Sequence, residues 1–306
     1  MSEPTTKGLF DRGISEGFVQ ALNALPNDSW WRRLLGHEKI FVAIRDEKLN
    51  AYYKGCSLAE IAFENGEITA RTHYKYLIRP VVASPYLTAV DGKFSFPDEW
   101  RGDHVFSPSF DHLDQIMRAA DRFAGKEKSF VGTIVKNNPN TLDVEIAMTA
   151  AFVEEDSEDE TLSALRIDIA ALVEREDALE LMMYEAKDFT NRKSLRSSTE
   201  APVIGQVQGY EAILADYNDQ LVRSYRQVAE NLASLVGIPE PRAKWAAKVA
   251  RAKNFRVSNL PTLIICGLDE DQKRGKHWGR HYERLEQGLG AHRIIARGSA
   301  DGVRLT

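Results

Sequence analysis

The chain has 306 residues and a net charge of −5; 43% of its residues are hydrophobic and 28% are charged, a composition typical of globular proteins and not of disordered ones. No apolar run approaches the roughly 20 residues that a membrane-spanning helix needs, and residues 1–7 lack the apolar segment of an export signal. With only Cys56 and Cys266 present, a disulfide framework is not indicated. We therefore expect a cytoplasmic protein that makes no contact with a membrane.

The charge is unevenly distributed along the chain. Residues 1–186 contain 20 Lys and Arg against 32 Asp and Glu, a net −12, whereas residues 187–306 contain 20 against 13, a net +7. A basic half on an acidic protein indicates a polyanionic partner. Solvated helix faces would give the same composition, so charge alone does not separate these interpretations.

The first third of the chain predicts an α+β module. A helix is expected over Glu16–Leu25, between the N-cap candidate Ser15 and Pro26. Alternating β-rich runs separated by turn-like segments predict an antiparallel β meander over residues 38–80. We assign residues 1–135 to a recognition or oligomerisation module, through which the chain would form a homo-oligomer or bind a partner protein. The other elements expected here are a surface loop at 84–108 and a helix over Phe110–Phe123.

Residues 136–306 predict an α/β domain with a central mixed sheet flanked by helices. Thr141–Val153 follows a cap-like cluster and predicts a helix, with a continuation into a strand left open. The apolar runs Leu165–Val173 and Leu179–Phe189 predict a hairpin of buried strands. The later elements expected are a long helix at 203–236, a helix at 243–252, a buried strand at 260–267, a polar helix at 275–288 and a strand at 292–297.

The predicted hairpin brings three charged residues together. With its turn centred between Glu176 and Asp177, Asp168 faces Glu185 across the two strands. Facing residues of an antiparallel pair point to the same side, with Cβ atoms roughly 4.5–5.5 Å apart. Lys187 is two residues beyond Glu185 and shares that side.

Two carboxylates in such apolar surroundings repel each other and lose hydration unless a cation compensates them. Asp168 and Glu185 offer the hard oxygen ligands that Mg²⁺ or Mn²⁺ prefers. The metal would activate a bound water, which Lys187 would orient while offsetting charge in the transition state. The alternative interpretation is an Asp–Lys–Glu ion-pair triad that only stabilises the hairpin.

A second motif follows on the next predicted helix, where Gln206 and Tyr210 lie one turn apart on the same face. The order Asp168, Glu185-x-Lys187, Gln206-x-x-x-Tyr210 resembles the PD-(D/E)xK nucleases, and within them the RecB/Cas4-like branch. The resemblance covers roughly residues 140–300 and implies a restriction-endonuclease-like core. It implies that Asp168 and Glu185 bind the metal, that Lys187 serves the water, and that Gln206 and Tyr210 shape the site. The alternative for Gln206 and Tyr210 is that they are an ordinary exposed glutamine and a packed tyrosine with no role in a site.

The same resemblance implies a further acidic metal ligand on a preceding helix. Glu145 is the candidate and Asp143 its competitor, although either acid would also suit the first turn of a helix. Ile167 replaces the proline of the family name, at a position that varies in the superfamily. Neither a cysteine cluster for an iron–sulfur site nor a phosphate-binding motor motif is present in the sequence.

The resemblance predicts a magnesium- or manganese-dependent nuclease (an endonuclease or an exonuclease) that acts on DNA, with RNA left open, in phage defence, restriction or DNA repair. A binding or scaffold protein that retains the nuclease fold is the alternative. Lys276–Trp278 would offer stacking to a base, and His277 and His281 are metal-ligand candidates that we favour as part of a basic surface. The residues expected to contact the nucleic-acid backbone are Arg192, Lys193, Lys244, Lys248, Arg251 and Lys276.

Overall fold

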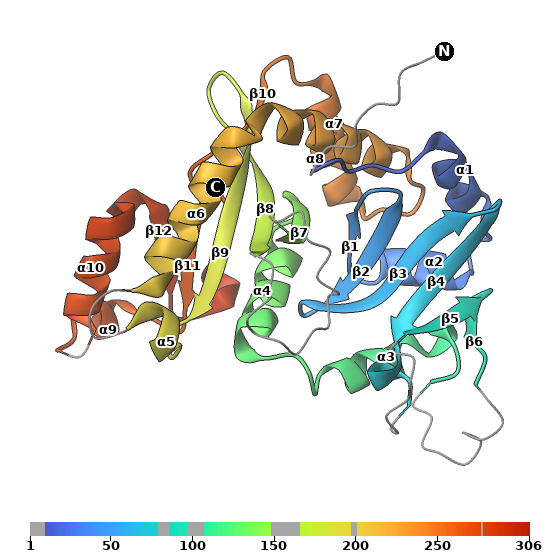
Figure 1. Ribbon diagram of the computed structural model, residues 1–306, viewed down its shortest axis with the longest axis horizontal. Coiled ribbons are helices and arrows are strands. Elements are labelled where there is room, and N and C mark those ends of the chain that lie inside the picture. Colours follow the sequence, from blue (N-terminus) through green and yellow to red (C-terminus); the bar gives the residue numbers. More distant parts are fainter. Residues whose placement is uncertain (1–9, 79–85, 97–106, 148–165, 197–200, 277) are drawn as a thin grey trace. The chain divides into compact units, whose positions relative to one another are not determined.

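The computed structural model describes residues 10–78, 86–96, 107–147, 166–196, 201–276 and 278–306 (Figure 1). The protein is a mixed α/β structure with two mostly antiparallel sheets. Within the described ranges, the helices are too short or too polar to cross a membrane.

The chain divides into two compact units. Unit 1 comprises residues 1–11, 133–226 and 248–306, and unit 2 comprises residues 12–132 and 227–247. These units differ from the expected division at residue 135 mainly because residues 227–247 cluster with the N-terminal residues.

The sheet of unit 2 is an antiparallel meander in which each strand pairs with the next one along the chain. Asn65–Gly66 and Asp91–Gly92 form two-residue turns with positive φ at both positions, a geometry that matches the twist of the flanking strands. The meander predicted within residues 38–80 is confirmed. The loop expected at 84–108 is wrong over residues 86–90, which pair with the preceding strand; residues 97–106 lie outside the described ranges. The strands are β1 (Phe41–Ile44), β2 (Lys48–Tyr53), β3 (Cys56–Glu64), β4 (Glu67–His73), β5 (Tyr86–Val90) and β6 (Lys93–Phe94).

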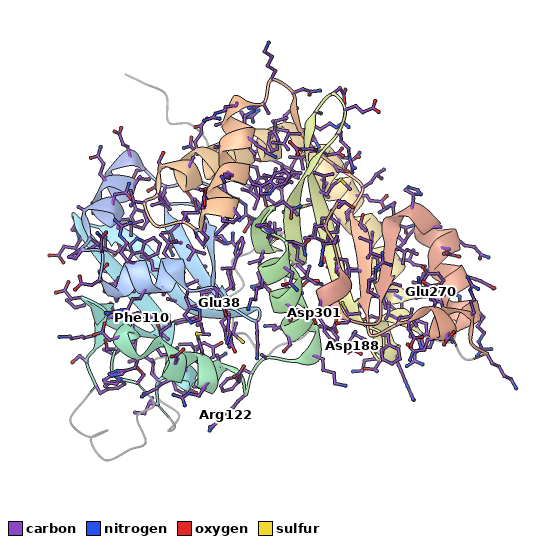
Figure 2. The ribbon with its side chains drawn as sticks, turned by 180° about the vertical axis from the view of Figure 1, so that it is seen from behind. Glu38, Phe110, Arg122, Asp188, Glu270 and Asp301 are labelled. Carbon is purple, nitrogen blue, oxygen red and sulfur yellow. The ribbon has the colours of Figure 1, made fainter. Side chains whose placement is uncertain are left out.

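Aromatic side chains fill much of the core of unit 2. Phe18 stacks on Phe63 with ring centroids 5.7 Å apart, and Trp30 stacks on Phe110 at 5.2 Å (Figure 2 labels Phe110). The helices expected near residues 16–25 and 110–123 are confirmed, the second beginning as a 3-10 turn. The helical elements are α1 (Glu16–Ala24), α2 (Trp30–Gly36), η1 (Tyr74–Tyr76), η3 (Phe110–His112) and α3 (Leu113–Ala120), followed by α4 (Lys126–Asn137), which leads into unit 1.

The sheet of unit 1 has the order β12-β11-β9-β8-β7. β11 runs parallel to β9 and β12, while β8 runs antiparallel to β7 and β9, and β10 pairs with the first residues of β9. Every residue of β11 is buried, as expected for a strand covered on both faces. The mixed sheet that was predicted for this half is therefore present. Its strands are β7 (Thr141–Ala147), β8 (Arg166–Glu174), β9 (Leu179–Asp188), β10 (Phe255–Val257), β11 (Thr262–Cys266) and β12 (Ile294–Arg297).

The helix expected over Thr141–Val153 is wrong for residues 141–147, which form the edge strand β7; residues 148–153 lie outside the described ranges. β-Branched residues such as Val144 and Ile146 favour a strand. The backbone of β7 finds its partners in β8, a strand distant in the sequence, so local pattern alone did not reveal it.

Helices α6 and α10 form one hydrophobic core with β11 and β12, to which they contribute Val203, Val207, Leu285 and Leu289. The long helix expected at 203–236 is interrupted at Tyr217, whose ring packs edge-on against Phe10 at 5.2 Å. The helical elements are α5 (Arg192–Leu195), α6 (Pro202–Asp216), α7 (Asn218–Ser234), α8 (Glu240–Arg251), α9 (Glu270–Arg274), α10 (Gly279–Leu289), η5 (Ala291–Arg293) and η6 (Ala300–Gly302), with α7 and α8 each spanning both units.

Candidate active site

Three carboxylate residues occupy one row across β7, β8 and β9. The β8–β9 register pairs Ile169 with Tyr184, so the next pair outward is Asp168 and Glu185. The β7–β8 register, followed through the same positions, places Glu145 opposite Asp168. The hairpin register predicted from the sequence is thereby confirmed, and we call Glu145, Asp168 and Glu185 the carboxylate row.

Glu145 has an unusual backbone conformation, with φ at +51° in the middle of a strand. A residue other than glycine in this left-handed region costs on the order of 1–3 kcal/mol, and such strain is typical of functional sites. Its expected place on a helix is wrong, because β7 carries it. The competitor Asp143 is buried elsewhere, where it accepts a hydrogen bond from the Tyr225 hydroxyl at 3.1 Å.

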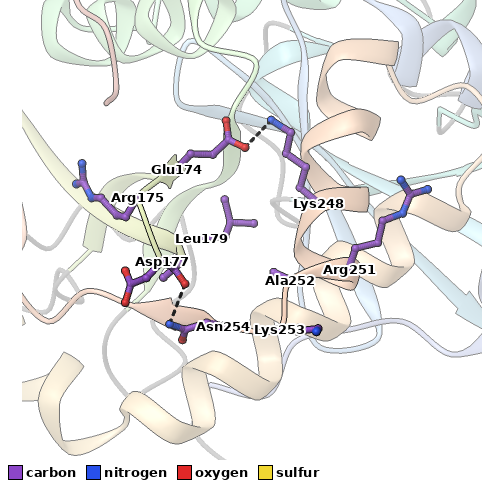
Figure 3. A pocket seen from close by; sticks show the side chains of 10 residues that line it. Glu174, Arg175, Asp177, Leu179, Lys248, Arg251, Ala252, Lys253 and Asn254 are labelled. Atoms are coloured by element: carbon purple, nitrogen blue, oxygen red, sulfur yellow. Dashed lines mark hydrogen bonds and ion pairs between the residues drawn. The ribbon is translucent and has the colours of Figure 1, made fainter.

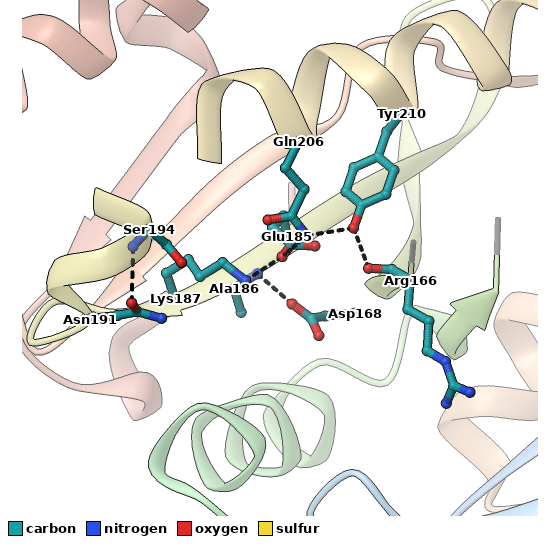
Figure 4. Close-up of polar contacts among 9 residues, drawn as sticks. All are labelled: Arg166, Asp168, Glu185, Ala186, Lys187, Asn191, Ser194, Gln206 and Tyr210. Atoms are coloured by element: carbon teal, nitrogen blue, oxygen red, sulfur yellow. Dashed lines mark hydrogen bonds and ion pairs between the residues drawn. The ribbon is translucent and has the colours of Figure 1, made fainter. Parts of the chain in front are cut away.

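Glu185 is almost fully buried, with 2% of its side chain exposed, and it is held by two donors (Figure 4). Its Oε1 accepts from Lys187 Nζ at 2.6 Å and from Gln206 Nε2 at 2.9 Å. Gln206 Nε2 also donates to the Tyr210 hydroxyl at 2.7 Å, and that hydroxyl donates to the carbonyl of Arg166. A continuous chain of hydrogen bonds therefore ties Glu185 to α6 and back to β8.

The local sequence of α6 explains why Gln206 and Tyr210 reach the row. Val203 and Val207 are buried against the sheet, and residues three or four apart lie on neighbouring parts of a helix surface. Gln206 is consequently not the ordinary exposed side chain of the alternative interpretation, and Tyr210 is both packed and hydrogen-bonded. Burial raises the pKa of Tyr210, and the nearby Glu185 carboxylate raises it further.

The electrostatics of the row centre on Asp168. Burial raises its pKa well above the ordinary value, and the carboxylates of Glu185 and Glu145 raise it further. Lys187 and the amide of Ala186, which donates to Asp168 Oδ2 at 2.7 Å, act in the opposite direction. Two carboxylates thus act against one lysine and one backbone amide on the pKa of Asp168.

This donor set consists of hard oxygens, which suit Mg²⁺ or Mn²⁺, and a divalent cation would relieve the repulsion within the row. As the side chains stand, no three Asp, Glu, His or Cys of the described residues are grouped to hold a metal ion. Glu185 points its Oε1 toward Lys187 and Gln206 instead. The chemistry of the residues fits such an ion, and binding would require the carboxylates to turn toward it.

In unit 1, the predicted backbone-binding residues include side chains near both ends of β9. Arg192 and Lys193 are exposed on α5, directly after β9. Lys248 and Arg251 line a pocket of about 410 Å³ beside the hairpin turn (Figure 3). Glu174 in that pocket is six residues from Asp168 on β8, so the pocket lies about 20 Å along the strand from the row.

The remaining predicted contact residues are Lys244 and Lys276. Lys244 belongs to unit 2 and pairs with Glu240 at 2.8 Å, while Lys276 is exposed between α9 and α10. The stacking expected of Trp278 is wrong, because Trp278 is only 4% exposed and packs inside the protein. His277 lies outside the described residues.

The surroundings of Trp278 were not predicted from the sequence. Phe189 packs on it with ring centroids 6.2 Å apart, and the Arg196 guanidinium lies 4.7 Å from its ring centroid. Among the signals available, only the density of arginine on both sides of Trp278 pointed to this region.

No family model, curated protein or solved structure matches the chain. The resemblance to PD-(D/E)xK nucleases therefore rests on the motif and on the arrangement of its residues.

Proposed function

We propose that unit 1 is a magnesium- or manganese-dependent nuclease that hydrolyses phosphodiester bonds in DNA, with a restriction-endonuclease-like core. The observation that carries the proposal is the carboxylate row together with Lys187, which lies two residues beyond Glu185 and pairs with it. Gln206 and Tyr210, which have the order and spacing of the RecB/Cas4-like branch, support the proposal. Gln206 donates a hydrogen bond to Glu185, and it donates another to the Tyr210 hydroxyl. We propose that this activity serves restriction, phage defence or DNA repair.

Asp168 and Glu185 would hold the metal ion, with Glu145 as a third oxygen donor. When bound, the ion would lower the pKa of a coordinated water and polarise a phosphodiester oxygen. Lys187, released from Glu185, would orient the attacking water and offset the negative charge that develops on the phosphorus oxygens.

Gln206 and Tyr210 are positioning residues in this proposal. Gln206 holds Glu185 by a hydrogen bond of 2.9 Å, and Tyr210 fixes Gln206 at 2.7 Å. Because Tyr210 is anchored to the Arg166 carbonyl, the orientation of Glu185 is coupled to β8, the strand that carries Asp168. Such a fixed network favours catalysis, because it holds the Glu185 carboxylate in one orientation.

The experiment is incubation of the full chain with supercoiled, linear and single-stranded DNA, and with RNA, in the presence of Mg²⁺ or Mn²⁺. We expect metal-dependent cleavage of DNA that is lost in Lys187→Ala and in Asp168→Ala. Glu180→Gln is the matched control, because Glu180 is a carboxylate on the same strand that pairs with Arg175 and Arg256 instead. Equal cleavage by the folded wild type and both site variants would refute the proposal.

A second candidate is a nucleic-acid-binding or scaffold subunit that keeps the fold without catalysis. The closed Lys187–Glu185 ion pair at 2.6 Å favours it, since it neutralises Glu185 from within the chain. Calorimetric titration with Mn²⁺ separates the two candidates. If the protein is a scaffold, no heat of Mn²⁺ binding should depend on Asp168 and Glu185. If it is a nuclease, the wild type should bind Mn²⁺ and Glu185→Gln should not.

A further inference from the structure

Beyond the end of β9, a basic side chain directly after α5 and another on α10 lie around one buried tryptophan. The Arg196 guanidinium lies 4.7 Å from the centroid of the Trp278 ring, and the His281 ring lies 6.1 Å from it, edge-on. We call Arg196, Trp278 and His281 the Trp278 cluster. All three residues belong to unit 1.

Each member of the Trp278 cluster has a buried nitrogen that lacks a hydrogen-bond partner in the part of the chain that the structure describes. These atoms are Nε of Arg196, Nε1 of Trp278 and Nδ1 of His281. The first two are obligatory donors, and Trp278 is only 4% exposed. Buried donors without acceptors are costly and uncommon. Two such donors and one unpartnered imidazole nitrogen around one ring indicate an acceptor that the described part of the chain does not supply.

The charges that shift the pKa values of Arg196 and His281 are all positive. Burial lowers the pKa of Arg196, and the neighbouring Arg192 lowers it further. Burial also lowers the pKa of His281, followed by the positive charges of Arg280, Arg284 and Arg196. The missing acceptor is therefore expected to be an anion with several oxygens.

We propose that the Trp278 cluster binds a phosphate group of the nucleic-acid strand on which unit 1 acts. The planar guanidinium of Arg196 matches phosphate oxygens, and the indole N–H and imidazole supply further donors. The inference rests on the proposed nuclease function for the identity of the strand.

The position of the cluster fits this role. Phe189, which packs on Trp278 at 6.2 Å, is two residues beyond Lys187, or about 7 Å along an extended chain. A phosphate held at the cluster would thus lie near the carboxylate row without touching it, and would fix the strand while another phosphodiester occupies the row.

The first test measures phosphate binding to the full chain without metal, so that cleavage plays no part. Inorganic phosphate is titrated while the imidazole signals are followed by NMR, with His281→Gln identifying the signal of His281. We expect the pKa of His281 to rise as phosphate binds, because the anion offsets the arginine charges. Arg196→Lys keeps the charge but loses Nε–H and the planar fork, and it should weaken phosphate binding about tenfold or more.

Two variants control for folding and for charge. Trp278→Phe keeps an aromatic ring in the core while removing the indole donor, and it should also weaken binding. Arg223→Gln removes the charge of an exposed arginine on α7 and should bind phosphate as the wild type does. An unchanged His281 pKa, or equal binding by Arg196→Lys and wild type, would overturn the proposal.

The second test compares 5′-phosphorylated and 5′-hydroxyl oligonucleotides of one sequence, again without metal. Weaker binding of both in Arg196→Lys indicates an internal phosphate, and weaker binding of only the phosphorylated strand indicates a terminal one. If inorganic phosphate binds but neither oligonucleotide depends on Arg196, the cluster is not a strand subsite. Phosphate binding by a protein that cleaves no nucleic acid would refute the nuclease function alone. Cleavage at the same rate in Arg196→Lys and in the wild type would refute this inference alone.

Discussion

Glu60 in unit 2 and Asp168 in unit 1 occupy similar places and have opposite surroundings. Each is on a strand that lies between two antiparallel neighbours. Glu60 receives two cations, Lys48 at 3.2 Å and the guanidinium of Arg71. Asp168 has a carboxylate on each side instead; burial raises its pKa, and the two carboxylates raise it further.

The charge of Glu60 therefore stabilises the fold, whereas the charge of Asp168 destabilises it. The cations around Glu60 satisfy it, and the partly exposed network contributes modestly to stability. The repulsion around Asp168 opposes folding, and proteins retain such arrangements mainly where function requires them. Substitutions in both sheets test this difference.

The largest effect is expected in Asp168→Asn. Asparagine can still accept the hydrogen bond from the Ala186 amide but offers no anionic ligand, so we expect metal-dependent cleavage to fall by at least on the order of 10³-fold. The free energy of unfolding should stay the same or increase, because a repelled charge has been removed. Cleavage assays and denaturant unfolding check both parts, and a large loss of stability would show that Asp168 supports the fold as Glu60 does.

Mn²⁺ is expected to stabilise the wild type against unfolding. At a free concentration of about 100 times its dissociation constant, a single-site ligand adds roughly 2.7 kcal/mol. Thermal unfolding with and without Mn²⁺ measures this effect, which should vanish in Glu185→Gln and persist in Glu60→Gln. Stabilisation that survives in Glu185→Gln would place the ion elsewhere.

Tyr210→Phe removes a buried hydroxyl that both accepts from Gln206 and donates to the Arg166 carbonyl. Leaving those groups without their partner should cost about 1–3 kcal/mol and should also weaken Mn²⁺ binding, because Gln206 loses its anchor. Tyr225→Phe is the matched control, since it removes another buried hydroxyl, the one bonded to Asp143. Comparable destabilisation by both variants, with weaker Mn²⁺ binding only in Tyr210→Phe, is the expected pattern in unfolding and calorimetric measurements.

Asp168 should also make stability depend on pH. Its pKa in the folded protein is raised above the ordinary value of 3.8, so the folded state favours the protonated acid. The contribution of Asp168 to the free energy of unfolding is therefore highest below that ordinary value and is lost as pH rises through the raised pKa. The stability difference between wild type and Asp168→Asn should widen in favour of the variant as pH rises above the ordinary value, and a constant difference would contradict the raised pKa.

The smallest effect is expected at Glu60. Because Glu60 and its partners are partly exposed, Glu60→Gln should lower the free energy of unfolding by less than about 1 kcal/mol. Added salt should reduce this difference further by screening the wild-type ion pairs. A loss of several kcal/mol would show that the balanced network contributes more to unit 2 than its exposure suggests.

Much of the candidate site was accessible from the sequence because its central part is local. Asp168 and Glu185 belong to one hairpin, and alternation with a short turn fixed their register. Gln206 and Tyr210 share a helix face, so their spacing alone placed them together. Glu145 was named from the resemblance but assigned to a helix, because the pairing that makes β7 a strand is with residues beyond 165.

Periodicity within short stretches was enough to predict the meander of unit 2, the β8–β9 hairpin and the convergence of Asp168, Glu185 and Lys187. The tertiary structure was needed to reveal the strand character of β7, the interruption of the long helix at Tyr217 and the burial of Trp278. It also decided that Lys248 and Arg251 lie at the far end of the hairpin from the carboxylate row. These features depend on partners distant in the chain, and packing between distant segments overrides local preference.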